Sequence, residues 1–311
     1  MRIAVIGLGD IAQKAYLPLL ANRGDIEVML CTRNRQTLDA LARQYRIVHM
    51  ACDPADLLKL AVKPDAVFVH VATEAHARIA SLFLEQGIPV YIDKPLAYTL
   101  EEATAMVELA EQRGVLLMTG FNRRFAPMIA SLKQTGFPRT VLMQKNRLHL
   151  PDRPRRFVFD DFVHVVDTLR FLSADVIRSW NVSYNAKDGL LYRVTLTLES
   201  DGCTAIGIMH RDSGVTEESV EVTSPGNKWR VEGLSSTVHC EGGEERHSAF
   251  NDWVTVLHRR GFPQIVDEFL ACVSEPRAPL VSARDSLETH AWCERIVERI
   301  ECDMAGDTAR E

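Results

Sequence analysis

The chain of 311 residues lacks several features that mark specialised classes of protein. It contains no apolar run long enough to cross a bilayer, no internal repeat and no low-complexity segment. It also has no excess of basic residues, because 36 Lys and Arg stand against 42 Asp and Glu for a formal net charge of -6. This balance argues against nucleic acid or an anionic membrane as the main partner. The composition of 46% apolar and 25% charged residues is typical of an ordinary globular protein.

The sequence also lacks a cysteine motif of the kind that binds a metal or forms a redox-active disulfide. The seven cysteines are odd in number and scattered, and none forms a C-x-x-C motif. Met1 leads directly into an apolar run, so the sequence shows no signal peptide. We therefore expect reduced thiols in a cytoplasmic protein and no metal site.

The order of the expected elements predicts an α/β protein with two domains. Strands and helices alternate with short links up to residue 121, which is typical of a Rossmann domain with a doubly wound parallel sheet. Residues 122–311 are expected to form an α+β domain, because residues 176–240 alternate β-rich runs with turn residues in the manner of a mostly antiparallel sheet. The polar stretch 241–247 is expected to form loops, and helices are expected over 262–273 and 287–300.

The first fifteen residues carry the clearest motif. An apolar run, Ile3 to Ile6, is followed at once by Gly7-x-Gly9-x-x-Ala12 and a helical pattern. Gly7 allows a tight turn, Gly9 lets a pyrophosphate approach the backbone, and Ala12 lets the helix pack close to the sheet. Asp10 and Ile11 complete the predicted cofactor-binding turn. A methyltransferase loop is the alternative, and the strands that follow favour a dinucleotide.

The second expected strand, residues 26–31, ends without a carboxylate. NAD-specific sites usually place an acidic residue here to bind the ribose 2′-hydroxyl. Thr32 and Arg33 stand in its place, and a guanidinium group would hold a 2′-phosphate by charge-assisted bonds. The sequence therefore favours NADP over NAD, unless these charges only open the next helix.

Two later strand ends also carry candidate cofactor contacts. Ala72, Thr73 and His76 follow the strand 66–71, although Thr73 also suits a helix cap and His76 a surface position. Asp93 and Lys94 follow the strand 90–92. A lysine buried there needs a partner or a lowered pKa, whereas in an arbitrary sequence it would be a surface residue.

A helix expected over residues 159–172 carries polar groups on one face. Asp160, His164 and Asp167 lie within roughly 60° of one another at about 100° per residue, opposite an apolar face. His164 could exchange a proton with a substrate hydroxyl while Asp160 fixes its tautomer. The alternatives are that Asp160 caps the helix, that His164 is exposed and that Asp167 is structural.

Four motifs together resemble one family. They are Gly7-x-Gly9-x-x-Ala12, Ala72-Thr73-x-x-His76, Asp93-Lys94-Pro95-Leu96-Ala97 and Gly120-Phe121-Asn122-Arg123-Arg124-Phe125. Their order and spacing are similar to those of the Gfo/Idh/MocA oxidoreductases, and segments such as GFNRRFAP and DDFVHVVD resemble its MviM (YceM) subgroup.

This resemblance implies hydride transfer between a nicotinamide and a sugar- or cyclitol-like substrate. It implies that Lys94 holds the reacting oxygen, that His164 acts with Asp160 as acid or base, and that Asn122 and Arg123 contact cofactor or substrate. It also implies a homo-oligomer formed through the second domain's sheet. A cofactor-binding sensor without turnover is the alternative. A Ser-Tyr-Lys dehydrogenase is disfavoured, because the sequence has no Tyr-x-x-x-Lys.

Overall fold

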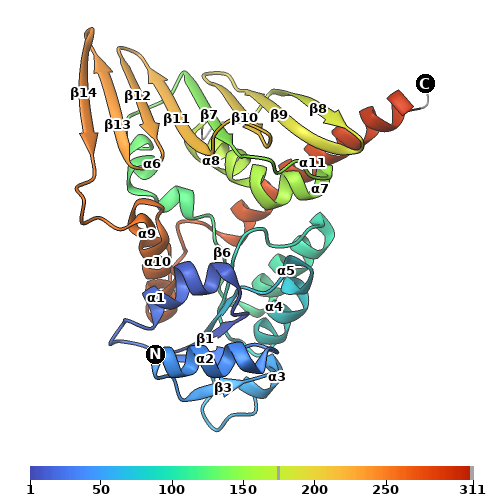
Figure 1. The fold of residues 1–311 in the computed structure, drawn as a ribbon, viewed down its shortest axis with the longest axis vertical. Coiled ribbons are helices and arrows are strands. Elements are labelled where there is room, and N and C mark those ends of the chain that lie inside the picture. The colour runs from blue at the N-terminus through green and yellow to red at the C-terminus, as the bar shows by residue number, and fades with distance from the viewer. Residues whose placement is uncertain (174–175, 309–311) are drawn as a thin grey trace. The chain divides into compact units, whose positions relative to one another are not determined.

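A computed structural model describes residues 1–173 and 176–308 (Figure 1). The chain divides into two compact units. The first comprises Met1–Gly120 and Ile265–Glu288, and the second comprises Phe121–Gln264 and the residues after Glu288. This differs from the expected single second domain over 122–311, because residues 265–288 belong to the first unit. Aromatic packing accounts for this placement, since the ring of Phe269 lies 5.1 Å from that of Phe68.

The sheet of the first unit has six parallel strands in the order β3-β2-β1-β4-β5-β6. They are β1 (Arg2–Ile6), β2 (Glu27–Cys31), β3 (His49–Ala51), β4 (Ala66–Val69), β5 (Val90–Ile92) and β6 (Leu117–Thr119). The predicted doubly wound sheet is confirmed, with β3 as a strand that the sequence pattern did not reveal. The chain order reverses between β1 and β4, which makes their carboxyl ends the expected place for a ligand.

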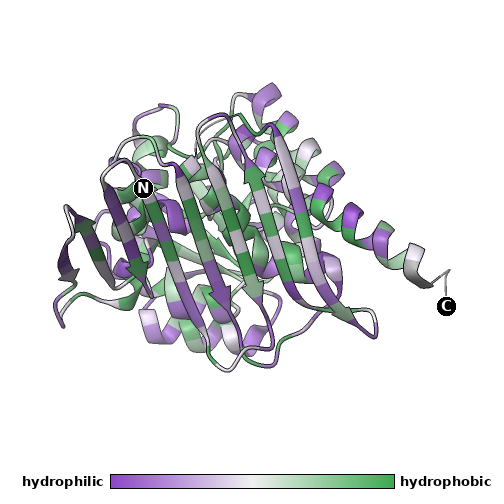
Figure 2. Ribbon diagram, turned by 90° about the horizontal axis from the view of Figure 1, so that it is seen from above, coloured by the Kyte–Doolittle hydropathy of each residue, from purple (hydrophilic) through white to green (hydrophobic). Residues whose placement is uncertain are grey.

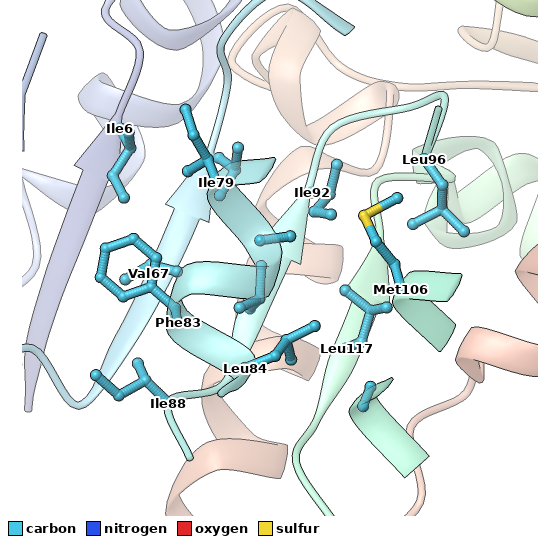
Figure 3. Packing of buried hydrophobic residues seen from close by; sticks show 14 of the residues in the cluster. Ile6, Val67, Ile79, Phe83, Leu84, Ile88, Ile92, Leu96, Met106 and Leu117 are labelled. Carbon is cyan, nitrogen blue, oxygen red and sulfur yellow. The ribbon is translucent and has the colours of Figure 1, made fainter. Parts of the chain in front are cut away.

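Helices bury both faces of this sheet. They are the π-helix η1 (Ala12–Tyr16), α1 (Leu17–Leu20), α2 (Arg35–Tyr45), α3 (Pro54–Leu57), η2 (Thr73–Ala75), α4 (His76–Leu84), α5 (Leu100–Arg113) and parts of α10 (Phe262–Ser274) and α11 (Ala283–Thr308). Figure 3 shows Ile79 and Phe83 of α4 and Met106 of α5 packed with Val67 and Leu117 of the strands. This apolar core fixes the strand ends that carry the site.

The second unit contains an eight-stranded sheet in the order β14-β13-β12-β11-β7-β10-β9-β8. Its strands are β7 (Thr140–Asn146), β8 (Ser179–Lys187), β9 (Leu190–Glu199), β10 (Thr204–His210), β11 (Glu217–Ser224), β12 (Asn227–Glu232), β13 (Ser236–Glu241) and β14 (Glu244–Ala249). Only β7 and β10 pair in parallel, so the predicted mostly antiparallel sheet is confirmed.

The expectation of loops over 241–247 is wrong. Residues 244–249 form the edge strand β14, joined to β13 through Gly242 and Gly243, which both have positive φ. Every residue of β14 is exposed. The strand therefore lacks the alternation of apolar and polar residues that indicates a strand with one buried face.

One face of the eight-stranded sheet is covered by helices, and Figure 2 shows these strands from the uncovered side. The described helical elements of this unit include η3 (Asn122–Phe125), α6 (Pro127–Leu132), α7 (Pro154–Arg156), the π-helix η4 (Phe157–Phe162), α8 (Val163–Ser173) and α9 (Val256–Arg259). Gly207 of β10 lets α8 approach, because a Cβ at this position would lie 2.5 Å from Val165 Cγ1.

Helix α8 is therefore buried on both sides. His164 and Asp167 are 6% and 1% exposed, so the alternative that His164 is exposed is wrong. The preceding π-helix, a form often found at functional sites, carries Asp160 and Asp161 into the same region.

Candidate functional site

A cavity of about 370 Å³ lies at the carboxyl ends of β1, β2 and β4. Five residues of the predicted cofactor set line it, namely Gly7, Gly9, Thr32, Arg33 and Ala72. This is the place where open parallel sheets bind dinucleotides.

The two glycines have different physical roles. Gly7 has a φ of +88°, and a Cβ there would lie 2.6 Å from the backbone of His70, so only glycine fits this turn. A Cβ at Gly9 would meet nothing within 4 Å, which leaves space for a phosphate beside the start of the helix. Ala12 is fully buried, as expected for close packing of helix on sheet. The turn therefore fits a bound pyrophosphate.

The cavity wall formed by β2 and α4 is cationic. Arg33 follows β2, and Arg78, which the sequence analysis missed, reaches the same cavity from α4. No Asp or Glu is among the described residues that line the cavity. The signal for Arg78 was its position two residues after His76, on a helix that begins at a strand end.

Several predicted cofactor residues do not line this cavity. Asp10 instead forms an exposed ion pair with Lys14 (2.7 Å), and Ile11 lies beside it at the helix start. Thr73 opens η2, and neither η2 nor α4 has a side-chain cap, so the predicted cap is wrong.

His76 is enclosed and joins two loops of the first unit. Its Nδ1 lies 2.9 Å from the Pro95 carbonyl oxygen, and its Nε2 lies 3.1 Å from the Val71 carbonyl oxygen. Burial lowers the pKa of His76, although these backbone acceptors favour the charged ring. His76 therefore fixes the loop of Lys94 and Pro95, whose peptide bond is cis, against the end of β4.

A buried tyrosine pair holds the carboxylate beside Lys94. Tyr16 Oη lies 2.8 Å from Tyr91 Oη and donates to Asp93 Oδ1 at 3.4 Å. Burial raises the pKa of Asp93, while Lys94 and His76 oppose the shift. Asp93 is thus fixed in the first unit, and Lys94 is half-buried directly after it.

His70 directly follows β4 and is buried. Its ring stacks on Tyr16 at 4.0 Å between ring centroids, and burial lowers the pKa of His70 to about 3. His70 also lines the cavity, and in the described part of the chain both of its ring nitrogens lack a hydrogen-bond partner. A neutral ring therefore forms part of the cavity floor.

The second unit contains a buried ion network that the sequence analysis missed. Lys145 of β7 is 1% exposed, and its Nζ lies 3.3 Å from Asp161 Oδ1 and 3.4 Å from Glu218 Oε2. Arg123 forms two hydrogen bonds to Glu218, at 3.0 and 2.9 Å, and Arg147 bonds Asp161 at 2.8 and 3.2 Å. The only local signal was the face that Lys145 shares with Val141 and Met143.

These contacts shift both partners of the Lys145–Glu218 pair. Burial lowers the pKa of Lys145 to about 8, although the carboxylates favour its charged form. Burial alone would raise the pKa of Glu218, but Arg123 and Lys145 outweigh it and hold that pKa far below its usual range. The network is therefore ionised at neutral pH.

The predicted polar residues of this unit separate into two groups. Asp167 accepts hydrogen bonds from Arg124 at 2.9 and 2.6 Å and from Thr289 at 2.9 Å, which supports the structural interpretation. His164 is buried, and Asp160 lies half-buried one turn before it.

Asn122 and Arg123 make contacts inside the second unit. Asn122 donates to the Arg260 carbonyl oxygen at 2.8 Å and accepts from Arg123 Nη1 at 3.2 Å. Both side chains are buried. The loop after β6 is therefore tied firmly to α9.

Among the described residues, no group of three His, Cys, Asp or Glu side chains could hold a metal ion. No described helix combines the length and the apolar character needed to cross a membrane.

The chain is similar to known oxidoreductases. A family model described as "Oxidoreductase family, NAD-binding Rossmann fold" (GFO_IDH_MocA) matches residues 1–121, and a "YceM-like, C-terminal domain" model matches residues 127–242. The chain is 31% identical over 305 residues to "Putative oxidoreductase YceM" of Salmonella typhimurium, with 96% of this chain and 97% of that protein covered.

Two further matches extend this picture. A crystal structure of a Gfo/Idh/MocA family oxidoreductase from Vibrio cholerae has a TM-score of 0.92 and 34% identity, and covers 98% of this chain and 99% of that one. D-glucoside 3-dehydrogenase of Escherichia coli is 36% identical over 127 residues, which are 40% of this chain and 36% of that protein.

Proposed function

Because the chain belongs to the Gfo/Idh/MocA oxidoreductases, we propose that it transfers a hydride between nicotinamide C4 and a carbon that bears a hydroxyl or carbonyl group. The observation that carries this proposal is the cavity at Gly7 and Gly9, where a phosphate can approach the helix start. A nicotinamide cofactor bound there would supply the hydride chemistry. The protein would bind and orient the substrate and move the proton.

We propose that NADP is preferred over NAD. Arg33 and Arg78 line the cavity beyond β2, and no carboxylate is present among the described lining residues. Guanidinium groups bind a phosphate through charge-assisted hydrogen bonds, which a 2′-hydroxyl cannot match. Thr32 adds a hydroxyl on the same wall.

The proposed proton transfer uses Lys94 and His164. Lys94 holds the reacting oxygen and assists its proton transfer, while the fixed Asp93 carboxylate and the His76-bound loop orient it. His164 acts as general acid or base, with Asp160 one turn away as a positioning residue. We also propose that Asn122 and Arg123 contact the cofactor or the substrate. The same holds for the other cofactor-binding residues predicted from the sequence.

We propose a sugar- or cyclitol-like substrate, a cytoplasmic location and a homo-oligomer formed through the eight-stranded sheet. The relative named D-glucoside 3-dehydrogenase supports a sugar-like substrate. The uncovered sheet face supports the oligomer, because Leu142, Ile206 and Ile208 lie half-buried near its middle.

Lys94→Ala tests the proposed enzyme. We expect a panel of polyols with NADP to identify a substrate, and the variant to lose turnover by about 10² to 10⁴-fold, the range of a lost acid–base group. NADPH affinity, measured by fluorescence titration, should stay within about threefold, since Lys94 does not line the cavity. The exposed Lys63→Ala variant is the matched control.

The outcomes separate the two hypotheses. Full turnover in Lys94→Ala would remove Lys94 from the mechanism. Binding of NADPH by a protein that turns over no member of the panel would favour a sensor, and absence of binding of both NADPH and NADH would refute the proposed function.

A further inference from the structure

We propose that the second unit binds a carboxylate or phosphate group of the substrate at a cluster of cationic side chains. This cationic cluster consists of Arg123, Lys145, Arg147, Arg211 and Arg260. The inference rests on the proposed function and narrows its substrate class to acidic or phosphorylated polyols and sugars.

The parallel pairing of β7 and β10 brings part of the cluster together. Both strands end at the same edge, and Arg147 N donates to the His210 carbonyl oxygen at 2.8 Å, next to Arg211. The π-helix η4 crosses this edge with Phe157 and Asp161 four residues apart. The Arg211 guanidinium lies 5.3 Å from the Phe157 ring centroid, and Arg147 bonds Asp161.

The other cations adjoin the cluster on the side of β11. Glu218 lies opposite Lys145 in the β11–β7 pairing and bonds Arg123. The Asn122 side chain joins Arg123 to the backbone of Arg260. Five cations from four segments of the chain thus gather at the ends of two neighbouring strands.

Cations of this cluster outnumber the carboxylates that pair with them in the described part of the chain. These carboxylates are Asp161, Glu218 and Asp152, the last at 3.8 Å from Arg211. Burial of part of the Arg260 side chain lowers its pKa, and repulsion from Arg123 and Arg147 lowers it further, while Glu218 opposes the shift. A structural ion network would be expected to balance its charges.

Arg211 gives an independent observation that points to a ligand. It is 8% exposed, and within the described part of the chain its Nε and Nη1 atoms have no hydrogen-bond partner. A buried donor without an acceptor is unfavourable by about 1–3 kcal/mol, and more when charged. An oxyanion would supply the acceptor and offset the excess charge.

The geometry of guanidinium groups selects the ligand chemistry. Their planar N–H donors match the paired oxygens of a carboxylate or phosphate, whereas a neutral hydroxyl satisfies them less well. The exposed Arg260 and the partly exposed Arg147 provide access. The cluster therefore distinguishes an acidic polyol from its neutral counterpart.

Isothermal titration of the full chain with matched polyols tests this inference. The probes are sorbitol, gluconate and sorbitol 6-phosphate, each titrated without cofactor and again with saturating NADPH. We expect gluconate or sorbitol 6-phosphate to bind at least tenfold more tightly than sorbitol, and the tighter acid identifies the oxyanion.

Two variants and one control locate the effect. Arg260→Gln and Arg147→Gln should each weaken binding of the acid about tenfold and leave sorbitol binding unchanged. Arg260→Gln removes an exposed side chain, so folding of this variant is safe. The control Arg178→Gln removes an exposed arginine of the same unit that pairs with Asp201, and it should change nothing.

Equal affinities for sorbitol and the acids, or binding of none of them, would overturn the inference. An acid preference that survives both variants would also overturn it. NADPH binding is measured on the same samples. Retained NADPH binding without acid preference defeats this inference alone, whereas acid preference without NADPH binding defeats the proposed function.

Discussion

At the scale of single residues, glycine and arginine have different roles at the cavity. Gly7 permits a turn that no other residue could adopt, because a Cβ would meet the His70 backbone at 2.6 Å. Arg33 and Arg78 reach the opposite wall with flexible, charged side chains. In the proposed function, the glycines admit either dinucleotide, and the arginines favour the one that carries a 2′-phosphate.

Arg33→Ala is expected to weaken NADPH binding about tenfold and to leave NADH binding unchanged. A hydrogen bond to a charged group contributes about 1.5–3 kcal/mol, and exposure at Arg33 reduces this value. Fluorescence titration of both cofactors measures the effect. Arg35→Ala is the control, because Arg35 pairs with Asp39 and is not among the residues that line the cavity. Equal affinities of the wild type for NADH and NADPH would contradict the predicted preference.

At the scale of elements, ion pairs connect strands and helices of the second unit. Lys145 of β7 lies between Asp161 of η4 and Glu218 of β11. Breaking such a buried network by removing one partner leaves charges without compensation. These contacts hold η4, and with it the start of α8 that bears His164, against the sheet.

Glu218→Gln is expected to lower the free energy of unfolding at pH 7 by about 3 kcal/mol, the size typical of a broken buried pair. The pKa of Glu218 is depressed in the folded protein, so its stabilisation is fully present above the unfolded pKa near 4.5. It is lost progressively as the pH falls from that value toward the depressed pKa of the folded protein. The difference between variant and wild type should therefore stay constant from pH 7 to about pH 5 and shrink below it.

Urea denaturation at several pH values measures this trend. Glu244→Gln in the exposed strand β14 is the control and should match the wild type at every pH. A difference for Glu218→Gln that stays constant from pH 7 to pH 3.5 would show that the Glu218 carboxylate is not held ionised by its neighbours.

At the scale of the whole molecule, the eight-stranded sheet leaves one face without helices (Figure 2). Leu142 and Ile206 lie side by side on β7 and β10, with Ile208 two residues along. Threonine, serine and glutamine residues surround them, as at the polar rim of an interface. This face suits association with a second copy.

Ile208→Arg is expected to convert an oligomer into a monomer. A charge placed in the apolar centre of an interface is desolvated without a partner, which is unfavourable. Light scattering coupled to size-exclusion chromatography measures the mass. Glu85→Arg, at an exposed position of the first unit just after α4, should keep the wild-type mass. A wild type that is monomeric at tens of micromolar would contradict the proposed oligomer.

The sequence could predict those parts of the site that depend on neighbouring residues. The strand, glycine turn and helix at the N-terminus form one continuous segment, so their residue types indicate both the fold and the ligand. The Lys145 network was not predictable in this way, because Glu218 reaches Lys145 through strand pairing and Asp161 reaches it from the π-helix η4. Arg78 was missed for a similar reason, since its helix begins beyond a different strand.

The sequence by itself determined the doubly wound sheet and the antiparallel second sheet, because local periodicity and turn chemistry carry that information. The resemblance of its four motifs indicated the family. Only the tertiary structure decided that residues 265–288 join the first unit, that Asp167 is bound by Arg124 and Thr289, and that His76 is enclosed. These outcomes depend on which segments, far apart in the chain, pack against each other and exclude water. Burial is a property of the packed chain, and no short stretch of sequence records it.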